Sequence, residues 1–338
     1  MIYPLIKKIL FQLDAEKAHT LSLNMLSGMH RVGLTSFLKV KDVNKPRQVM
    51  GLTFPNPVGL AAGMDKDGRC IDALGSLGFG FIEVGTVTPK PQRGHDKPRL
   101  FRIPESDAII NRMGFNNDGV EACVNRLRER TYKGVLGVNI GKNIDTPAAA
   151  AVTDYLICMR TAYPVADYIA INISSPNTPG LRDMQDDVPL SHLLDELKEA
   201  QKVLSDQYQK YVPIAIKMAP DLTADQVENF ARLILMKGAD GVIATNTTTA
   251  RDGVQGFKFS SEEGGMSGRP LKEKSTHIVQ TLYEVLQGQI SIIGVGGIMS
   301  SQDAKEKIKV GAHLVQIYSG LVYRGPQLIR DSIKGLSS

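Results

Sequence analysis

Serine and asparagine meet at the end of an apolar run in the stretch INISSPNTPG, residues 171–180. Proline, asparagine and glycine are typical of a turn, but a turn does not need Ser175 held between the end of a strand and Pro176. A hydroxyl at this position could take part in proton transfer, or it could belong to an ordinary loop. The residues that share its surroundings must decide between these two interpretations.

Asparagine recurs near the ends of other apolar runs. Asn111, Asn172, Asn177 and Asn246 each offer a carbonyl acceptor beside two N–H donors. Each of them, taken alone, is more often a residue that forms a turn. Four asparagines that face one cavity would match the edge of a flat ring with amide or imide groups, such as a pyrimidine. They therefore favour a planar substrate that is rich in hydrogen-bonding groups.

Glycine-rich segments and two lysines indicate a second ligand. The segments IIGVGGI (292–298) and VQIYSGLVYRG (315–325) follow the last predicted strands, where barrel enzymes commonly hold a phosphate. The segment GGMSGRP (264–270) offers a further exposed backbone. Lys66 and Lys217 stand at strand ends, and a lysine beside a flavin ring would stabilise its reduced, anionic form. These features predict a cofactor that carries a phosphate.

Several other chemistries find no support in the sequence. The six histidines lie outside the strand-end motifs, so no histidine is placed to activate a serine or cysteine nucleophile. No metal-ligand spacing, phosphate-loop motif or dinucleotide motif is present at a strand end, and we expect neither a metal nor a nucleic-acid partner. Cys70, Cys123 and Cys158 share no close spacing, which favours a reducing compartment over a disulfide framework.

The elements that must position these residues are short, nearly continuous apolar runs. Such runs are typical of parallel strands that are buried on both faces, and helix-length stretches such as residues 190–206 and 224–237 separate them. Eight strand–helix units predict a single (β/α)8 barrel, with a doubly wound open sheet as the alternative. LFRI and AIINRM, which flank residues 104–107, predict a β-hairpin over the barrel mouth. The eight runs are PVGLAAG (57–63), FIEVGTV (81–87), VLGVNIG (135–141), YIAINIS (168–174), PIAIKMA (213–219), GVIATNT (241–247), ISIIGVGG (290–297) and LVQIYSG (314–320).

The N-terminal segment differs from the rest of the chain. Residues 1–41 carry six basic and two acidic side chains, and this excess of +4 is most of the net charge of +5. Residues 3–12 and 14–31 predict two helices, the second with Asp14 as its N-cap. No apolar run approaches the roughly 18 residues that a membrane span requires. We expect residues 1–41 to form a helix pair that lies on a membrane surface, and residues 42–338 to form the barrel.

The apolar face of the second predicted helix leaves one alternative open. Its apolar residues recur at helical spacing and could equally pack against the barrel; they are Ala18, Leu21, Met25, Leu26 and Met29.

Longer motifs carry a resemblance to a known family. GLAAGMDKDG, VGTVTPKPQ, NRMGFNN, INISSPNTPGLR, IATNTT, GGMSGRP and IIGVGGI, taken in order along essentially the full chain, resemble dihydroorotate dehydrogenase of the quinone-dependent class 2 branch. The resemblance implies an FMN-containing (β/α)8 barrel with two N-terminal helices. It also implies oxidation of (S)-dihydroorotate to orotate in de novo UMP synthesis, with hydride transfer to FMN and reoxidation by a membrane quinone.

The same resemblance assigns roles to individual residues. It implies Ser175 as the catalytic base, with Phe115 and Thr178 beside the exit of the proton. Where class 2 has this serine, class 1 has cysteine, so Ser175 places the chain in class 2. The substrate would contact Lys66, Asn111, Arg112, Met113, Gly114, Phe115, Asn172, Asn177, Asn246 and Thr247. FMN would contact Ala62, Gly63, Met64, Asp65, Lys66, Thr86, Asn139, Asn172, Lys217, Thr245, Gly268, Gly297, Tyr318 and Ser319.

The resemblance also gives the setting of the enzyme. Quinone contacts are expected at His19 and Arg102, and the protein is expected to be peripheral to the cytoplasmic side of a bacterial cell membrane. We also expect a monomer, because the helix pair would occupy one face of the barrel. Two alternatives remain open at this point. One is a flavin barrel that reduces pyrimidines with a nicotinamide partner, and the other is a catalytically silent barrel that serves as a membrane-bound binding module.

Overall fold

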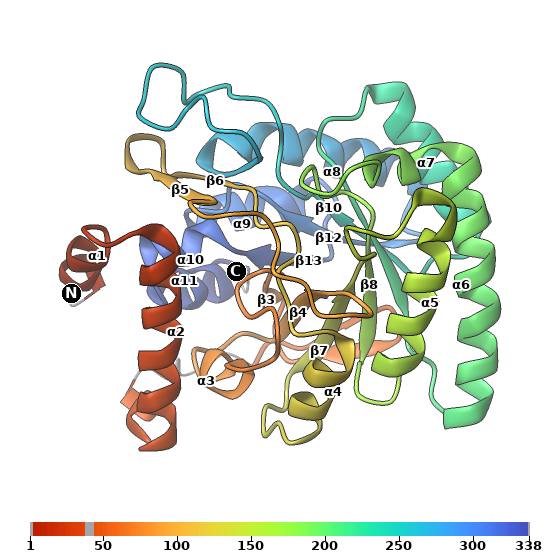
Figure 1. Ribbon diagram of the computed structural model, residues 1–338, viewed down its shortest axis with the longest axis horizontal. Coiled ribbons are helices and arrows are strands. Elements are labelled where there is room, and N and C mark those ends of the chain that lie inside the picture. The colour runs from red at the N-terminus through yellow and green to blue at the C-terminus, as the bar shows by residue number, and fades with distance from the viewer. Residues whose placement is uncertain (1–2, 38–43, 337–338) are drawn as a thin grey trace.

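Eight parallel strands close into a barrel in the computed structural model, which describes residues 3–37 and 44–336 (Figure 1). The barrel strands are β3 (Val58–Leu60), β4 (Phe81–Val87), β7 (Val135–Ile140), β8 (Tyr168–Asn172), β9 (Ile214–Met218), β10 (Gly241–Ala244), β12 (Ser291–Val295) and β13 (Leu314–Ile317). Each pairs in parallel with the next in this order, and β13 pairs with β3 to complete the ring. The predicted (β/α)8 barrel is confirmed, and the alternative of an open sheet is wrong.

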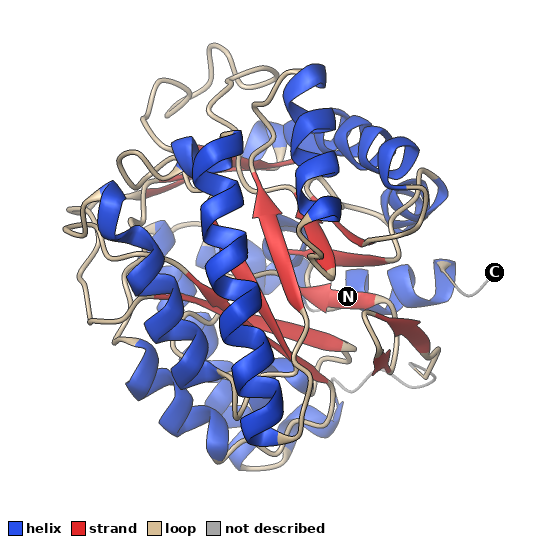
Figure 2. Cartoon of the chain, turned by 90° about the vertical axis from the view of Figure 1, so that its right-hand side faces the viewer, coloured by secondary structure: helices blue, strands red, loops and turns tan. Residues whose placement is uncertain are grey.

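Helices surround the barrel and bury its outer face (Figure 2). Local sequence explains where several of them begin: Thr223 and Gln226 form a reciprocal capping box at α7, and the Ser300 side chain caps α9. Both helices expected from the sequence at 190–206 and 224–237 are present. The outer helices are α3 (Ile71–Gly75), α4 (Val120–Arg128), α5 (Ala151–Ala162), α6 (Asp187–Tyr208), α7 (Ala224–Met236), α8 (Lys272–Leu286), α9 (Ser301–Lys309), α10 (Ser319–Arg324) and α11 (Gln327–Gly335).

The N-terminal end of the barrel is closed by a hairpin of β1 (Arg47–Val49) and β2 (Leu52–Phe54). Phe54 packs edge-to-face on Phe81, with 5.2 Å between the ring centroids. Gly137 leaves room for a second aromatic ring inside the barrel, because a Cβ there would lie 2.2 Å from the Tyr168 ring. This lower half of the interior is therefore filled, and the interior opens only at the other end.

A small antiparallel sheet stands over the open end. β5 (Leu100–Ile103) and β6 (Ala108–Asn111) form the predicted hairpin, which is confirmed. A third strand, β11 (Gly265–Gly268), pairs with β6 and was not predicted. The sequence GMSG has neither the length nor the β-branched side chains that indicate a strand, so its pairing depends on the tertiary structure.

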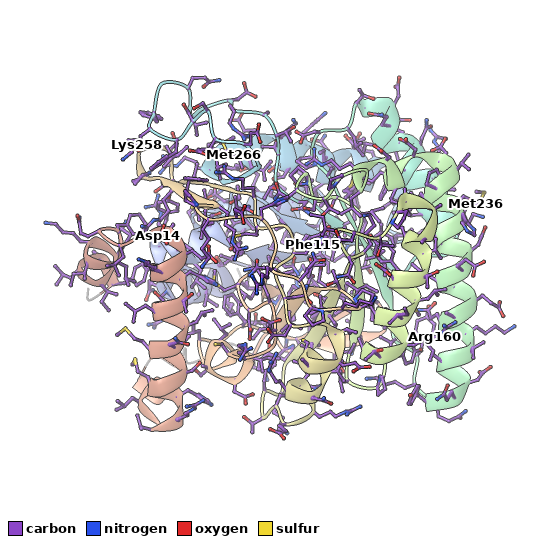
Figure 3. All side chains as sticks on the ribbon, viewed as in Figure 1. Asp14, Phe115, Arg160, Met236, Lys258 and Met266 are labelled. Carbon is purple, nitrogen blue, oxygen red and sulfur yellow. The ribbon has the colours of Figure 1, made fainter. Side chains whose placement is uncertain are left out.

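Two helices precede the barrel, α1 (Tyr3–Leu10) and α2 (Ala15–Arg31), and both lie at one flank (Figure 1). Asp14, at the junction of the two helices (Figure 3), caps α2 as predicted, because its carboxylate accepts hydrogen bonds from the backbone N–H groups of Glu16 and Lys17. The Tyr3 hydroxyl donates to the carbonyls of Leu321 and Val322, which ties α1 to α10. The predicted boundary at residues 41 and 42 lies outside the described residues.

The apolar face expected on α2 is divided in the structure. Ala18 is buried and Leu26 packs against the core, whereas Leu21 and Met25 remain exposed. The barrel therefore covers only part of this face, and the rest of it is open to solvent. None of the helices in the described segments is both long enough and apolar enough to cross a membrane.

Candidate functional site

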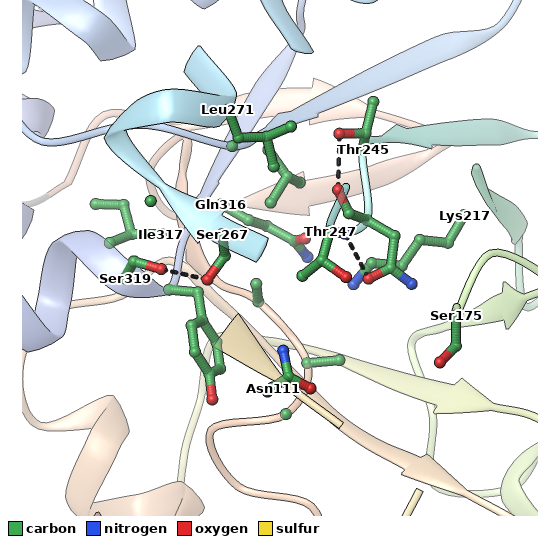
Figure 4. A pocket seen from close by; sticks show the side chains of 18 of the residues that line it. Asn111, Ser175, Lys217, Thr245, Thr247, Ser267, Leu271, Gln316, Ile317 and Ser319 are labelled. Carbon is green, nitrogen blue, oxygen red and sulfur yellow. Dashed lines mark hydrogen bonds between the residues drawn. The ribbon is translucent and has the colours of Figure 1, made fainter. Parts of the chain in front are cut away.

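A pocket opens at the carboxyl ends of the barrel strands, beneath the small sheet (Figure 4). Most of the residues expected at the site line it, including residues from loops far apart in sequence. The predicted residues in its wall are Ala62, Gly63, Lys66, Thr86, Asn111, Met113, Gly114, Phe115, Asn172, Ser175, Asn177, Lys217, Thr245, Asn246, Thr247, Gly268, Gly297, Tyr318 and Ser319. Met64, Asp65, Asn139 and Arg112 are not in this wall.

The four predicted residues outside the wall have other surroundings. Asp65 accepts hydrogen bonds from the backbone N–H groups of Arg69 and Cys70, and it thereby shapes the loop after β3. Met64 is buried in the core cluster. The Arg112 guanidinium turns away from the pocket, where it donates to Glu262 at 2.7 Å and to the Pro98 carbonyl at 2.9 Å. Asn139 lies directly beneath the wall.

One end of the pocket is rich in glycine and hydroxyl groups. The hydroxyls of Ser267 and Ser319 lie 2.8 Å apart (Figure 4), next to the backbone of Gly268 and Gly297. Gly268 has φ +107° and a Cβ there would meet the Asp107 carbonyl at 2.1 Å, so no larger residue fits. Hydroxyls and close backbone of this kind suit a phosphate group.

Amide side chains form a connected network at the other end. Asn172 donates to the Thr86 hydroxyl at 2.9 Å, and Asn246 donates to Asn172 at 3.3 Å. Across the pocket, the Asn177 amide donates to the Asn111 carbonyl at 3.2 Å. All four asparagines line this one pocket, and the hydrogen bonds within each of the two groups hold the amides in fixed orientations.

Ser175 lies in the pocket wall with only 5% of its surface exposed. Its Oγ accepts a hydrogen bond from the backbone N–H of Asn177 at 3.2 Å, which leaves the hydroxyl proton free to point into the pocket. The neighbouring Thr178 hydroxyl is buried without a hydrogen-bond partner among the described residues. Ser175 therefore lies in the wall of the same pocket as the four asparagines.

Lys66 brings the positive charge that this pocket needs for an anion. Within the described ranges, no carboxylate lies at ion-pair distance from its amine. Burial lowers the pKa of Lys66 to about 8, an effect that nearby Glu16 partly offsets. A half-buried ammonium without a fixed partner favours the binding of a carboxylate.

A buried polar layer lies beneath the pocket floor. Glu83, in the middle of β4, accepts hydrogen bonds from Asn139 and Lys217 at 2.7 and 3.3 Å. It also accepts from Tyr168 and Gln316 at 3.0 and 2.7 Å. Sequence reasoning missed Glu83 because it examined strand ends, although a carboxylate inside the apolar run FIEVGTV was the available signal.

The segment 111–115 and the loop before it cover the pocket. His95 lies 2.7 Å from the Asn177 carbonyl through its Nε2 atom. Gly114 allows this contact, because a Cβ there would lie 2.7 Å from the His95 ring. Phe115 lies near the centre of the molecule and its ring packs against the core (Figure 3). The cover is thus joined to the loop that carries Ser175.

A second residue missed from the sequence joins two active-site loops. Arg182 donates to the Ser174 carbonyl at 3.1 Å and to the Thr247 carbonyl at 2.9 Å. It also pairs with Asp221 at 2.9 Å. Arg182 ends the motif INISSPNTPGLR, but its partners lie on other loops, so only the fold shows that it fixes the loops after β8 and β10 relative to each other.

The two residues expected to contact a quinone lie where the helix pair meets the barrel. Arg102 donates to the carbonyls of Leu10 and Leu13 and stacks on Phe11, with 4.5 Å from its guanidinium carbon to the ring centroid. Burial, together with the nearby charge of Lys66, lowers the pKa of His19 to about 4. His19 is therefore neutral at physiological pH.

Comparison with known proteins agrees with this architecture. The profile of the family described as "Dihydroorotate dehydrogenase" matches residues 46–338. A protein of Methylobacillus flagellatus named "Dihydroorotate dehydrogenase (quinone)" is 55% identical over 99% of this chain and 100% of its own length. A protein of Idiomarina loihiensis with the same name is also 55% identical, with the same shares of the two chains covered.

A solved structure shares the fold as well. The crystal structure titled as DHODH from Eimeria tenella in complex with ferulenol has a TM-score of 0.86 and 38% sequence identity, and the match covers 94% of this chain and 90% of that one. The profile match, the two relatives and the shared barrel with its N-terminal helices lead to one conclusion. The chain belongs to the dihydroorotate dehydrogenase family.

Proposed function

We propose that this protein oxidises (S)-dihydroorotate to orotate in pyrimidine biosynthesis, with FMN as cofactor and a membrane quinone as the final electron acceptor. The observation that carries the proposal is the single pocket wall that brings together Ser175, Lys66, the four asparagines and the glycine-rich loops. FMN, held in this pocket, would supply a hydride acceptor for the substrate and an electron donor for the quinone.

The pocket fits FMN by the chemistry of its donors. The end with Ser267, Ser319, Gly268 and Gly297 suits the phosphate, as described above. Thr86 and Thr245 line the space between that end and the amide network. Lys217 lies in the floor with 7% of its side chain exposed, where its charge would favour the anionic reduced form of the cofactor.

The amide network and Lys66 fit dihydroorotate. The substrate carries a carboxylate and a ring with carbonyl and N–H groups, so it requires one cation and several side chains that both donate and accept. We assign the carboxylate to Lys66 and the ring to Asn111, Asn172, Asn177 and Asn246. Arg112 does not reach the pocket through its side chain, and we limit its role to holding the covering segment through Glu262.

Ser175 is assigned the proton that leaves the substrate carbon. A serine without a histidine is a weak base, so the proton must pass onward through hydrogen bonds as it leaves. The buried Thr178 hydroxyl, three residues along the same loop, is a suitable next acceptor. His95 lies on the far side of Asn177 and contacts its carbonyl, so we assign it to holding the loop.

The N-terminal helices are assigned to the membrane and the quinone. Leu5, Ile6 and Ile9 on α1 and Leu21 and Met25 on α2 are exposed apolar side chains, between 42% and 69% accessible. Basic residues on the same segment would add attraction to anionic lipid. We propose a monomer that lies on the cytoplasmic side of a bacterial cell membrane, with the quinone near His19 and Arg102.

Steady-state turnover with a released-cofactor assay tests this function. We expect the purified protein to reduce a quinone analogue only when dihydroorotate is present, and to release FMN on denaturation. A flavin barrel of the nicotinamide-dependent kind would instead oxidise reduced nicotinamide, and a silent binding module would turn over neither donor.

A further inference from the structure

Glu83 lies inside the barrel, directly below the proposed cofactor site, and has no role in the proposed function. Its side chain is 0% exposed, and its four hydrogen-bond donors come from four different strands, β7, β8, β9 and β13. A carboxylate enclosed in this way is costly unless it is paired, because the barrel interior excludes water. Its placement therefore requires an explanation.

The hydrogen bonds show that Glu83 is ionised. Lys217 can only donate to its Oε1. Asn139 also donates there, because its own Oδ1 already accepts from Thr86 and Asn172, which fixes the orientation of its amide. An oxygen that faces two such donors carries no proton. The other oxygen, Oε2, accepts from the Gln316 amide and the Tyr168 hydroxyl, so all four contacts suit an anionic Glu83 that pairs with Lys217.

This pairing decides the state of Lys217. A buried ammonium without a counter-charge loses its proton readily, and buried lysines can change their protonation near neutral pH. Glu83 removes that tendency and also fixes the direction of the Lys217 chain, whose amine lies at the pocket floor. The positive charge below the cofactor thus depends on a residue that does not touch it.

We propose that Glu83 is a positioning residue that keeps Lys217 charged and in place beneath the cofactor, and thereby sets how readily the cofactor is reduced. This inference rests on the proposed FMN site. It predicts that the charge on Lys217, and not merely the integrity of the barrel, is what changes when Glu83 is replaced.

Other titratable groups that face this region must be separated from Lys217. Among the described residues these are Tyr168 on β8, Tyr318 after β13 and Lys66 after β3. Burial raises the pKa of Tyr318 to about 12 and raises that of Tyr168 well above its usual range, so both stay neutral. Lys66 has a pKa of about 8 and does titrate, but it is present in every variant below.

The test compares the midpoint potential of bound FMN in four holoenzymes over about pH 6 to 9. They are the unchanged protein, Glu83→Gln, Lys217→Met and the double variant. With rising pH, the potential of Glu83→Gln should fall below that of the unchanged protein towards that of Lys217→Met. A tenfold change in the reduction equilibrium, about 30 mV for a two-electron couple, is the expected size. The double variant should run parallel to Lys217→Met over this pH range, offset by the Glu83 charge that Lys217→Met still buries.

Two outcomes would overturn the inference. One is a curve for Glu83→Gln that runs parallel to that of the unchanged protein. The other is a double variant whose potential still falls relative to Lys217→Met as the pH rises, because a group other than Lys217 would then titrate.

A denaturant titration supplies an arm that needs no FMN. Lys217→Met leaves the Glu83 charge buried and unpaired, so adding Glu83→Gln should raise the denaturation midpoint above that of Lys217→Met alone. A double variant no more stable than Lys217→Met would contradict the pairing. This comparison does not use the Glu83→Gln single variant, so it tests the pairing even if that variant does not fold. Because it needs no FMN, it also separates a failure of this inference from a failure of the proposed FMN site.

Discussion

Ser175 shows how far a single residue can be interpreted before its surroundings are known. The sequence placed it at a strand end before proline, and the structure adds that its Oγ accepts from Asn177 and faces the pocket. Its hydrogen-bond partners could not be predicted, because they depend on the path of the loop. Glu83 is the opposite case, since its four partners come from four strands and only the closed barrel brings them together.

Replacement of Ser175 by alanine should slow reduction of the flavin by dihydroorotate by about 10² to 10⁴, the usual loss for a missing general base. Orotate affinity should change little, because the substitution removes one oxygen, and Ser175→Cys should recover part of the rate. Stopped-flow absorbance measures each variant. Ser332→Ala is the control, since Ser332 is buried in α11 and does not line the pocket, and it should lose far less. Flavin reduction at the unchanged rate in Ser175→Ala would show that Ser175 is not the base.

Lys66 should make substrate binding depend on pH. Its pKa is lowered to about 8, and only the protonated form attracts a carboxylate. Orotate should therefore bind most tightly below about pH 8, and its dissociation constant should rise about tenfold per pH unit above that value. Flavin absorbance titrations with orotate measure this.

The Lys66→Met variant is the control for that dependence. It should bind orotate about tenfold to a hundredfold more weakly, since charge-assisted hydrogen bonds contribute roughly 1.5–3 kcal/mol, and with no step near pH 8. A step that survives in Lys66→Met would assign the titration to another group.

At the scale of elements, the apolar runs predicted all eight barrel strands because a buried strand needs apolar residues on both faces. β11 was missed because its four residues carry no such signal, and only pairing with β6 makes it a strand. The α2 helix was predicted with its cap, but its periodicity could not show which apolar residues are covered. Leu21 and Met25 are exposed because the barrel does not cover them, and this depends on tertiary packing, which the sequence pattern does not show.

The exposed apolar residues of α1 should carry membrane attachment. Leu5 and Ile9 are 67% and 69% exposed. Replacing both with serine should reduce binding to anionic vesicles in a sedimentation assay. The loss should be clearest at high salt, because the remaining charge attraction is then screened. Flavin reduction by dihydroorotate should persist, because neither residue lines the pocket.

Val188 and Met236 supply the matched control for α1. They are 80% and 72% exposed on α6 and α7, and Met236 lies at the opposite flank of the molecule (Figure 3). Serine at these two positions should leave vesicle binding unchanged. Equal loss from both pairs would show that attachment depends on general surface hydrophobicity and not on the helix pair.

At the scale of the whole molecule, the N-terminal helices and the catalytic loops are joined by one chain of contacts. The Arg99 guanidinium binds Glu16 of α2 at 2.8 and 3.1 Å and also donates to the carbonyls of Arg93 and His95. His95 in turn contacts Asn177 beside Ser175. Because these residues are far apart in sequence, no local pattern predicts their connection, and removal of the helix pair would also disturb the pocket cover.

The central claim is that dihydroorotate delivers its electrons to a flavin in this pocket. Anaerobic mixing of the purified holoenzyme with dihydroorotate tests it most directly, with the flavin absorbance as the signal. We expect dihydroorotate to bleach the absorbance and a quinone analogue to restore it. A flavin that stays oxidised with dihydroorotate, while reduced nicotinamide bleaches it, would contradict the account.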